Sequence, residues 1–288
     1  MISLTNEVIL VEGQNPRELV RTAINLLGDT WKEFVLNSKK IFVHPNLVTF
    51  HKEEACTNVE TVRGVIDHIS LLTDKEILVG DAGFRNTKKA FENFNYESLK
   101  RSGNVKLVDL NDDETIESWA YDYDFNKKPI PFSKTVAESD FHIVVVPAKM
   151  HLYYTVSLSL KTAVIGSMVV TKSPFGIYAR WPWIHTGYKQ AHMTLAEVYT
   201  EHPAHLAIID GTRAMEGDGP ADGEVVNLGW VIVSFNPIAA DTLASYLMGW
   251  NPENDIGYLY YLKKMGWGPT SVDELKIKGG DPEKLRKK

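Results

Sequence analysis

Short apolar runs alternate with segments of helical periodicity along most of this chain, and this alternation limits the fold more than any other feature. Residues 7–11 predict a strand, and Asn15 and Pro16 then predict a helix start, because asparagine caps helices and proline fits their first turn. The order repeats in two further pairs, strand 40–43 with helix 59–69 and strand 76–79 with helix 88–94. Parallel strands need crossover helices, so we expect an α/β protein, a three-layer sandwich around a mostly parallel sheet.

The chain has 288 residues, of which 44% are hydrophobic, and this is enough for one core. We expect a single α/β domain over residues 1–268 and a C-terminal tail over residues 269–288. Further strands are expected at 105–110, 141–146, 206–209 and 230–233, and further helices around 191–198, from Pro237 and at 256–265.

Three segments depart from this pattern. Residues 111–126 are acidic without a clear period and are expected to form a surface excursion. Residues 130–134 predict an edge strand, because the flanking prolines would not be tolerated in the centre of a sheet. Residues 172–188 are rich in proline, glycine and aromatic side chains, and such a long aromatic loop is usually a lid or a binding loop.

Composition excludes several classes of partner and location. The net charge of −6 argues against nucleic acid, and no apolar run approaches the roughly 20 residues that cross a bilayer. Cys56 is the only cysteine, so the chain forms no internal disulfide and offers no cysteine-based zinc site. The N-terminus has an acidic Glu7 and no basic region before its apolar stretch, unlike a signal peptide. These features predict a cytoplasmic protein.

The middle of the chain carries an unusual distribution of charge. From Phe141 to Ala196 there is no Asp or Glu, although the window contains five Lys and Arg residues and four histidines. The rest of the chain has 26 basic against 37 acidic residues, a balance of −11. A cleft with one sign of charge attracts ligands of the other sign, so the window predicts a pocket for a small anion. The alternative is a tightly packed segment whose lysines are solvated.

Polar residues follow several of the predicted strands. Pro147 is expected to end the strand at 141–146, just before the charged residues begin. Ligands of open parallel sheets bind outside the carboxyl ends of the strands, so residues after strand ends should converge on one rim. The candidates are His44, Asn46, Asp81, Gly83, Lys149, His151, Asp210 and Gly211. An aspartate in such a position can also be only a helix cap or a turn former.

Two further places offer candidate ligands. Residues 210–220 predict a polar loop that contains three glycines, one of them Gly219, and the acidic Glu216; the loop is neither a Walker A loop nor GxGxxG. Such a loop can present backbone N–H groups to an anion, or it can be a flexible turn. Asp241 lies early in the helix from Pro237, where a carboxylate also favours the positive end of the helix dipole.

The histidines do not have the spacing of a metal site. His151, His185 and His192 form no HExxH motif and lie in the acid-free window, so Asp81, Asp210 or Glu216 would have to complete a metal site. The sequence identifies no metal and no cofactor.

Several ordered motifs resemble one known family. They are Pro147-x-x-x-His151 with Ser159-Leu160-Lys161 and Gly166, then Gln190-Ala191-His192, Ile209-Asp210-Gly211, Glu216-Gly217-Asp218-Gly219-Pro220 and Asn236-Pro237-Ile238-Ala239-Ala240-Asp241. Over roughly residues 38–268 the chain resembles the domain of unknown function 362 family, which is uncharacterised. The resemblance implies relatives that carry a ferredoxin-type module with cysteine-bound iron–sulfur clusters. This chain departs from them, because one cysteine cannot bind a cluster and His44 stands where the family usually has lysine.

Two functions from different classes fit these observations. In the first, the chain is an enzyme or enzyme-like protein that binds a small carboxylate or phosphate. Lys149 and Lys161 would hold the anion, and His151 or His192 would move a proton. The other ligand residues would come from the set His44, Asn46, Asp81, Gly83, Asp210, Glu216, Gly219 and Asp241.

In the second, the chain is a non-catalytic accessory protein. It would dock to a redox or assembly partner protein through the aromatic residues 178–183, because Tyr, Trp and Arg together favour interface contacts.

Overall fold

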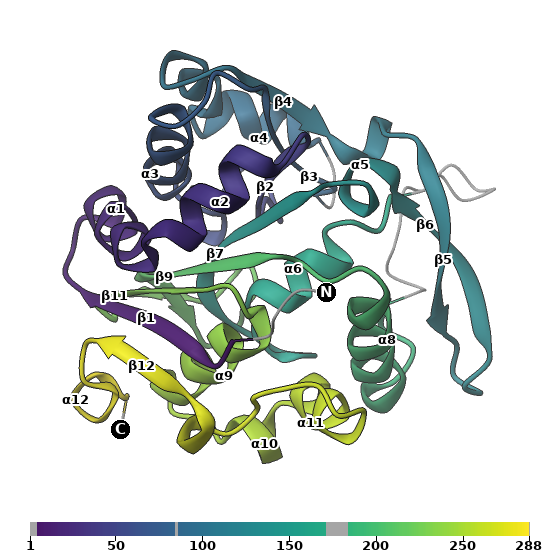
Figure 1. Cartoon of the computed structure of the whole chain (residues 1–288). Coiled ribbons are helices and arrows are strands. Elements are labelled where there is room, and N and C mark those ends of the chain that lie inside the picture. Colours follow the sequence, from purple (N-terminus) through teal and green to yellow (C-terminus); the bar gives the residue numbers. More distant parts are fainter. Residues whose placement is uncertain (1–4, 84–85, 171–183, 288) are drawn as a thin grey trace.

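A computed structural model describes residues 5–83, 86–170 and 184–287, and its centre is a ten-stranded mixed sheet (Figure 1). The main path of the sheet has the order β12-β1-β11-β9-β7-β2-β3-β4, and β8 and β10 pair with β7 and β9. The strands are β1 (Glu7–Glu12), β2 (Ile41–Pro45), β3 (Ile77–Asp81), β4 (Val105–Asp109), β7 (Phe141–His151), β8 (Thr155–Ser157), β9 (Leu206–Glu216), β10 (Glu224–Val226), β11 (Trp230–Ser234) and β12 (Lys276–Gly279).

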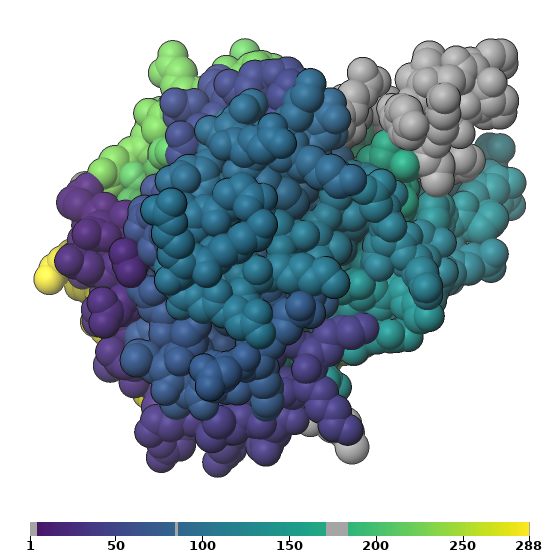
Figure 2. Space-filling model, turned by 90° about the horizontal axis from the view of Figure 1, so that it is seen from above, coloured from purple at the N-terminus to yellow at the C-terminus, as the bar shows by residue number. Residues whose placement is uncertain are grey.

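Helices cover both faces of this sheet, as the alternation in the sequence predicts. One face carries α1 (Pro16–Leu27), α2 (Asp29–Asn37), α3 (Val59–Ser70) and α4 (Thr87–Asn93). The other carries α6 (Ser159–Ile165), α8 (Tyr188–Glu201), α9 (Pro237–Leu247) and α11 (Gly257–Lys264). In the view of Figure 2, purple to blue residues of the N-terminal half cover most of the face turned to the reader. The predicted three-layer α/β sandwich is therefore confirmed.

The local signals for the first helix act as predicted. The side chain of Asn15 accepts a hydrogen bond from the backbone N–H of Glu18, and Pro16 occupies the first turn. The structure adds α2, which follows directly after Gly28 and which the sequence pattern did not suggest.

The sheet is parallel from β4 to β9, but β11 runs antiparallel to both of its neighbours. The connection from β9 to β11 contains the short strand β10 and no helix. A parallel crossover usually contains a helix, and this connection contains only a strand that pairs back on β9, so the chain returns antiparallel. The predicted strand at 230–233 is present, and its direction is the exception to the parallel pattern.

Strands β7 and β9 run further than their apolar sequences suggest. Pro147 does not end β7, because the register against β9 shifts between Pro147 and Lys149 and the strand then continues to His151. A bulge is a place where a strand tolerates proline. The prediction of a strand end at Asp210-Gly211 is also wrong, since β9 continues to Glu216 and pairs there with β10.

Residues 111–126 are not a featureless surface excursion. They contain β5 (Thr115–Tyr121), which pairs antiparallel with β6 (Lys127–Ser133) in a separate two-stranded sheet that includes the predicted edge strand. This hairpin packs on α8, where the hydroxyl of Tyr121 donates to Glu197 at 3.0 Å and the indole N–H of Trp119 donates to Glu201 at 3.2 Å. The contact with α8 explains why aromatic side chains occur in an acidic segment.

The last residues of the chain contact the sheet. β12 pairs parallel with β1 at the edge of the sheet, so segments from the two ends of the sequence lie side by side (Figure 1). Lys287 forms an ion pair with Glu216. Short α-helices in the described part of the chain are α5 (Lys134–Ala137), α10 (Pro252–Asp255) and α12 (Pro282–Leu285).

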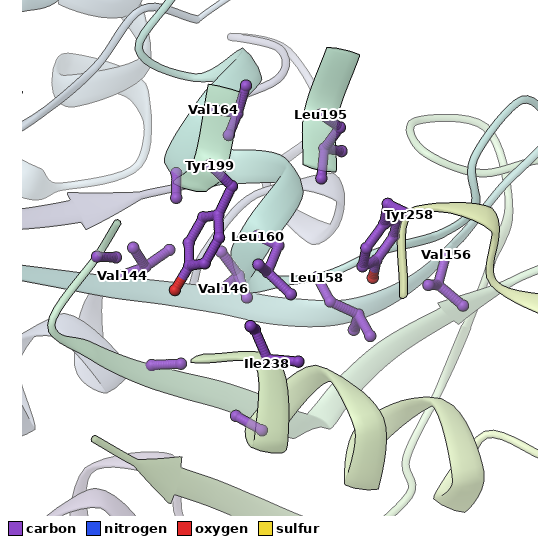
Figure 3. Packing of buried hydrophobic residues seen from close by; sticks show 14 of the residues in the cluster. Val144, Val146, Val156, Leu158, Leu160, Val164, Leu195, Tyr199, Ile238 and Tyr258 are labelled. Carbon is purple, nitrogen blue, oxygen red and sulfur yellow. The ribbon is translucent and has the colours of Figure 1, made fainter. Parts of the chain in front are cut away.

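The larger hydrophobic cluster lies between the sheet and the layer of α6, α8 and α9. Figure 3 shows Val144 and Val146 of β7 close to Leu160 of α6, with Tyr199 and Ile238 from the neighbouring helices. This packing fixes α6 against β7, and both elements supply residues of the site described below. None of the helices in the described part of the chain has the length and apolar character that a membrane span requires.

Candidate functional site

Basic side chains from three elements gather around the ring of Tyr154. The ring centroids of His151 and His192 both lie 5.2 Å from that of Tyr154, and His185 lies 6.0 Å away. The Nζ atom of Lys161 is 5.3 Å from the same centroid. Tyr154 is fully buried and donates its hydroxyl to the carbonyl of Ile184 at 2.7 Å. We call these five residues the Tyr154 cluster.

The fold brings the cluster together from positions 41 residues apart in the sequence. His151 ends β7, Tyr154 lies in the turn before β8, Lys161 is on α6 and His192 is on α8. His151, Lys161 and His192 are at most 9% exposed. The structure therefore places Lys161, His151 and His192, all predicted from the sequence, at one buried place, and adds Tyr154 and His185 to them.

The turn after β7 determines the state of the His151 ring. Its Nδ1 atom accepts hydrogen bonds from the backbone N–H groups of Tyr153 at 3.0 Å and Tyr154 at 3.3 Å. Burial lowers the pKa of His151 far below its ordinary value, and the positive charge of Lys161 lowers it further. His151 is therefore a neutral imidazole.

His192 is fully buried in an aromatic environment. Tyr188, Tyr154 and Tyr258 lie within 6.0 Å of it between ring centroids. Neither of its ring nitrogens has a hydrogen-bond partner of normal geometry among the described residues. Burial lowers the pKa of His192 to about 4, against a smaller opposing effect of the Tyr153 backbone.

This lowered pKa predicts a dependence of stability on pH. Below pH 6.5 the unfolded chain binds a proton at residue 192 and the folded chain does not, so stability is lost as the pH falls toward 4. The loss that belongs to His192 is roughly 3 kcal/mol, because each pKa unit corresponds to about 1.4 kcal/mol. Urea unfolding at pH 4 to 7 should show a shallower decline for His192→Gln than for wild type. The exposed His51 provides the control, since His51→Gln should keep the wild-type slope.

Lys149 is buried beside the cluster. It is 1% exposed, and its ammonium group donates to the side-chain oxygen of Asn46 at 2.6 Å and to the carbonyl of Ala55 at 2.7 Å. Burial lowers the pKa of Lys149 to about 8. Its charge contributes to the lowered pKa of His151, but its hydrogen bonds tie β7 to the segment after β2.

Next to Lys149, three buried side chains form a hydrogen-bonded chain across β3, β2 and β7. The Nε2 atom of His44 lies 3.1 Å from Oδ1 of Asp81, and its Nδ1 atom lies 3.0 Å from Nε2 of His142. The other carboxylate oxygen of Asp81 accepts the backbone N–H of Leu47 at 2.7 Å. His44 and Asp81 are thus partners of each other within the protein, and Gly166 packs directly against both.

The carboxylate of Asp241 contacts the start of a helix other than its own. Its carboxylate does not lie at the start of its own helix but holds the beginning of α6, accepting the backbone N–H groups of Ser159 at 2.9 Å and Leu160 at 3.2 Å. It also accepts the hydroxyls of Ser159 at 2.5 Å and Tyr258 at 2.9 Å. Burial raises the pKa of Asp241 to about 7. Asp241 therefore positions α6 and Lys161.

Three other predicted ligand residues have local structural contacts. Asp210 lies inside β9 and accepts hydrogen bonds from Thr61 at 2.5 Å and from the backbone and hydroxyl of Thr212 at 2.8 and 2.7 Å. A side chain at Gly83 would place its Cβ 2.4 Å from the carbonyl of Leu47. A side chain at Gly219 would place its Cβ 2.0 Å from the carbonyl of Met150. These glycines allow close backbone approach.

Glu216 lies apart from the Tyr154 cluster, in the wall of a cavity of about 330 Å³. The lining of this cavity is mostly apolar and comprises Met150, Ala214, Met215, Glu216, Val226, Leu228, Met248, Gly249, Trp250 and Lys287.

The sequence also predicted an aromatic loop and considered a metal site. The aromatic residues 178–183, expected to form a lid or a docking surface, lie outside the described residues. Within the described ranges, no group of three or more His, Cys, Asp or Glu side chains is arranged to hold a metal ion.

Comparison with known proteins supports the fold and the family. The structure is similar to the lactate racemase apoprotein of Thermoanaerobacterium thermosaccharolyticum, with a TM-score of 0.51 and 12% sequence identity over 83% of this chain. The match spans only 56% of that protein, and at this identity it supports the α/β fold alone. The thylakoid-associated protein sll1697 of Synechocystis sp. is 24% identical over 260 residues, which cover 88% of this chain and 76% of that protein.

A family model matches residues 41–246, and this range contains the His44–Asp81 pair, the whole Tyr154 cluster and Asp241. The chain therefore belongs to the family described as Domain of unknown function (DUF362).

Proposed function

We propose that the Tyr154 cluster binds a small anion, a carboxylate or a phosphate, and that the chain is an enzyme that transfers a proton at this site. The proposal depends mainly on one observation: four basic side chains surround one buried ring, and all four come from a stretch of sequence, Phe141 to Ala196, that contains no Asp or Glu. His151 and His192 are neutral at pH 7, so they can offer N–H groups to an anion beside the positive charge of Lys161.

The properties of the individual groups support this assignment. Lys161 and His151 approach the same ring, so one ligand with two oxygen atoms can contact both. The buried carboxylate of Asp241 accepts four hydrogen bonds from Ser159, Leu160 and Tyr258, and these hold the start of α6, the helix that carries Lys161. Burial keeps His192 neutral at pH 7, so its ring can accept a proton from a bound ligand.

We also propose a cytoplasmic location. The single Cys56 is buried and burial raises the pKa of its thiol to about 11, as suits a structural thiol in a reducing compartment. The cyanobacterial relative is named as thylakoid-associated, and association with a membrane surface is the alternative that fractionation of cells would detect.

A thermal-shift experiment tests anion binding. We expect phosphate, sulfate, acetate, lactate, pyruvate or succinate, compared at constant low ionic strength, to raise the melting temperature, because a ligand at 100 times its Kd stabilises by about 2.7 kcal/mol. Lys161→Met should abolish this stabilisation. The matched control is Lys189→Met, which removes an exposed lysine of the same acid-free window and should respond as wild type does. No stabilisation of wild type by any of these anions would contradict the proposal.

A further inference from the structure

The hydrogen bonds of His151 fix where its proton lies. A neutral imidazole carries one N–H group and one bare nitrogen. The Nδ1 atom of His151 accepts two backbone N–H groups, from Tyr153 at 3.0 Å and Tyr154 at 3.3 Å, so the bare nitrogen is Nδ1 and the proton is on Nε2. The turn from residue 151 to residue 154 holds both donors in place, so the tautomer is a property of the backbone fold.

The same turn opposes both other states of the ring. The Nδ1–H tautomer would direct an N–H group at two N–H donors, and so would the imidazolium ion, which is protonated at both nitrogens. The positive charge of Lys161 and the His185 ring also oppose the imidazolium. A group that transfers a proton must alternate between two of these states, and His151 is held in one of them.

The fixed N–H group of His151 is well placed for the ligand. The Nε2 atom forms no hydrogen bond among the described residues, and the ring keeps 8% exposure. The ring meets Tyr154 edge-on at 5.2 Å between centroids, and the Lys161 ammonium lies 5.3 Å from the same Tyr154 centroid. A carboxylate or phosphate can therefore accept the N–H group with one oxygen and contact the ammonium with another.

We propose that His151 is an anion-binding residue, which donates its Nε2–H group to an oxygen of the ligand and does not transfer the proton itself. This inference rests on the proposed function. It leaves proton transfer to His192, whose ring nitrogens have no comparable backbone donors among the described residues.

Two variants separate the two nitrogens of His151. In His151→Asn the amide oxygen can replace Nδ1 as acceptor for the turn, but no donor reaches the position of Nε2. In His151→Gln the longer side chain can place an N–H donor near the position of Nε2, but the acceptor for the turn is lost. We expect His151→Asn to keep the wild-type melting temperature and to bind phosphate and acetate at least tenfold more weakly in calorimetric titrations, since a hydrogen bond to a charged group contributes about that factor. His151→Gln should lower the melting temperature and retain most of the affinity.

Nuclear magnetic resonance tests the tautomer without any ligand. Long-range ¹H–¹⁵N correlation spectra of the full chain should show His151 as the Nε2–H tautomer at pH 7, with no titration down to pH 5. An Nδ1–H tautomer, or protonation above pH 5, would overturn the inference. Wild-type binding of phosphate or acetate by His151→Asn would overturn it as well and would leave anion binding at the cluster intact. If wild type binds neither probe, the proposed function fails and the ligand role of His151 fails with it.

Discussion

Replacing Gly166 with alanine is expected to destabilise the protein by about 3 kcal/mol, because overpacking a rigid buried site costs that much. A Cβ atom at this position would lie 2.5 Å from the carbonyl oxygen of Thr162, 2.7 Å from Oδ1 of Asp81 and 2.8 Å from Nε2 of His44. The carbonyl belongs to the helix backbone, and the two side chains are held by their own hydrogen bond. The added methyl group must therefore displace α6 or separate His44 from Asp81.

Urea unfolding measures this effect, and a second glycine controls for it. Gly268→Ala adds the same methyl group where the nearest atom is 3.4 Å away, and we expect only a small change. If Gly166→Ala unfolds at the wild-type urea concentration, the end of α6 does not pack against the His44–Asp81 pair as described. The nuclear magnetic resonance signals of the His44 and His142 rings should also shift in Gly166→Ala, since the hydrogen bond between the two rings depends on the position of His44.

Replacing Asp241 with alanine is expected to cost about 3–5 kcal/mol. The carboxylate accepts four hydrogen bonds in a fully buried place, and its removal leaves the backbone N–H groups of Ser159 and Leu160 without an acceptor at about 1–3 kcal/mol each. Because these N–H groups begin α6, the variant should also bind anions more weakly by moving Lys161. Asp241→Asn keeps one acceptor oxygen and should lose less.

The stability of wild type should depend on pH in a way that the stability of Asp241→Asn does not, because only wild type has a carboxyl group that titrates at position 241. The folded protein holds the pKa of this carboxyl at about 7, above its ordinary 3.8, so its folded state favours the protonated form. The stability that this preference contributes is present below pH 3.8 and is lost as the pH rises through 7. Wild type should therefore lose stability relative to Asp241→Asn between pH 5 and pH 8 in chemical unfolding. A constant difference over this range would show that the carboxyl titrates normally.

The sequence predicted the layers of the fold because each element carries its own signal. Asn15 and Pro16 start α1, and the apolar spacing of α3 defines the face that packs on the sheet. The direction of β11 has no such signal, because it depends on whether the connection before it contains a helix or, as here, a short strand that pairs with β9. In the β5–β6 hairpin only β6 was predicted, because the aromatic side chains of β5 contact α8, which lies about 70 residues later in the sequence.

The site could be predicted in part for a similar reason. The acid-free window marks Lys161, His151 and His192 as an unusual set, and the fold brings them to one ring. The position of an aspartate in the sequence does not show its partner: Asp241 lies in the predicted helix, but its carboxylate holds the start of α6, and Asp210 was placed at the end of a strand that continues. His142 gave no signal, because its bond to His44 requires β2 and β7 to be neighbours across 98 residues of sequence.

The extension of β7 beyond Pro147 has a consequence for which changes in length the chain can accept. Successive side chains of a strand point to opposite sides, so Met150 reaches the apolar cavity while Lys149 and His151 reach the polar groups. Deleting one residue here would exchange the two sides of the strand. Met150 would then replace Lys149 among the polar groups, and a lysine side chain would point into the cavity that methionines line. A substitution in this segment therefore changes either the apolar cavity or the polar site, whereas the insertion or deletion of one residue would disrupt both.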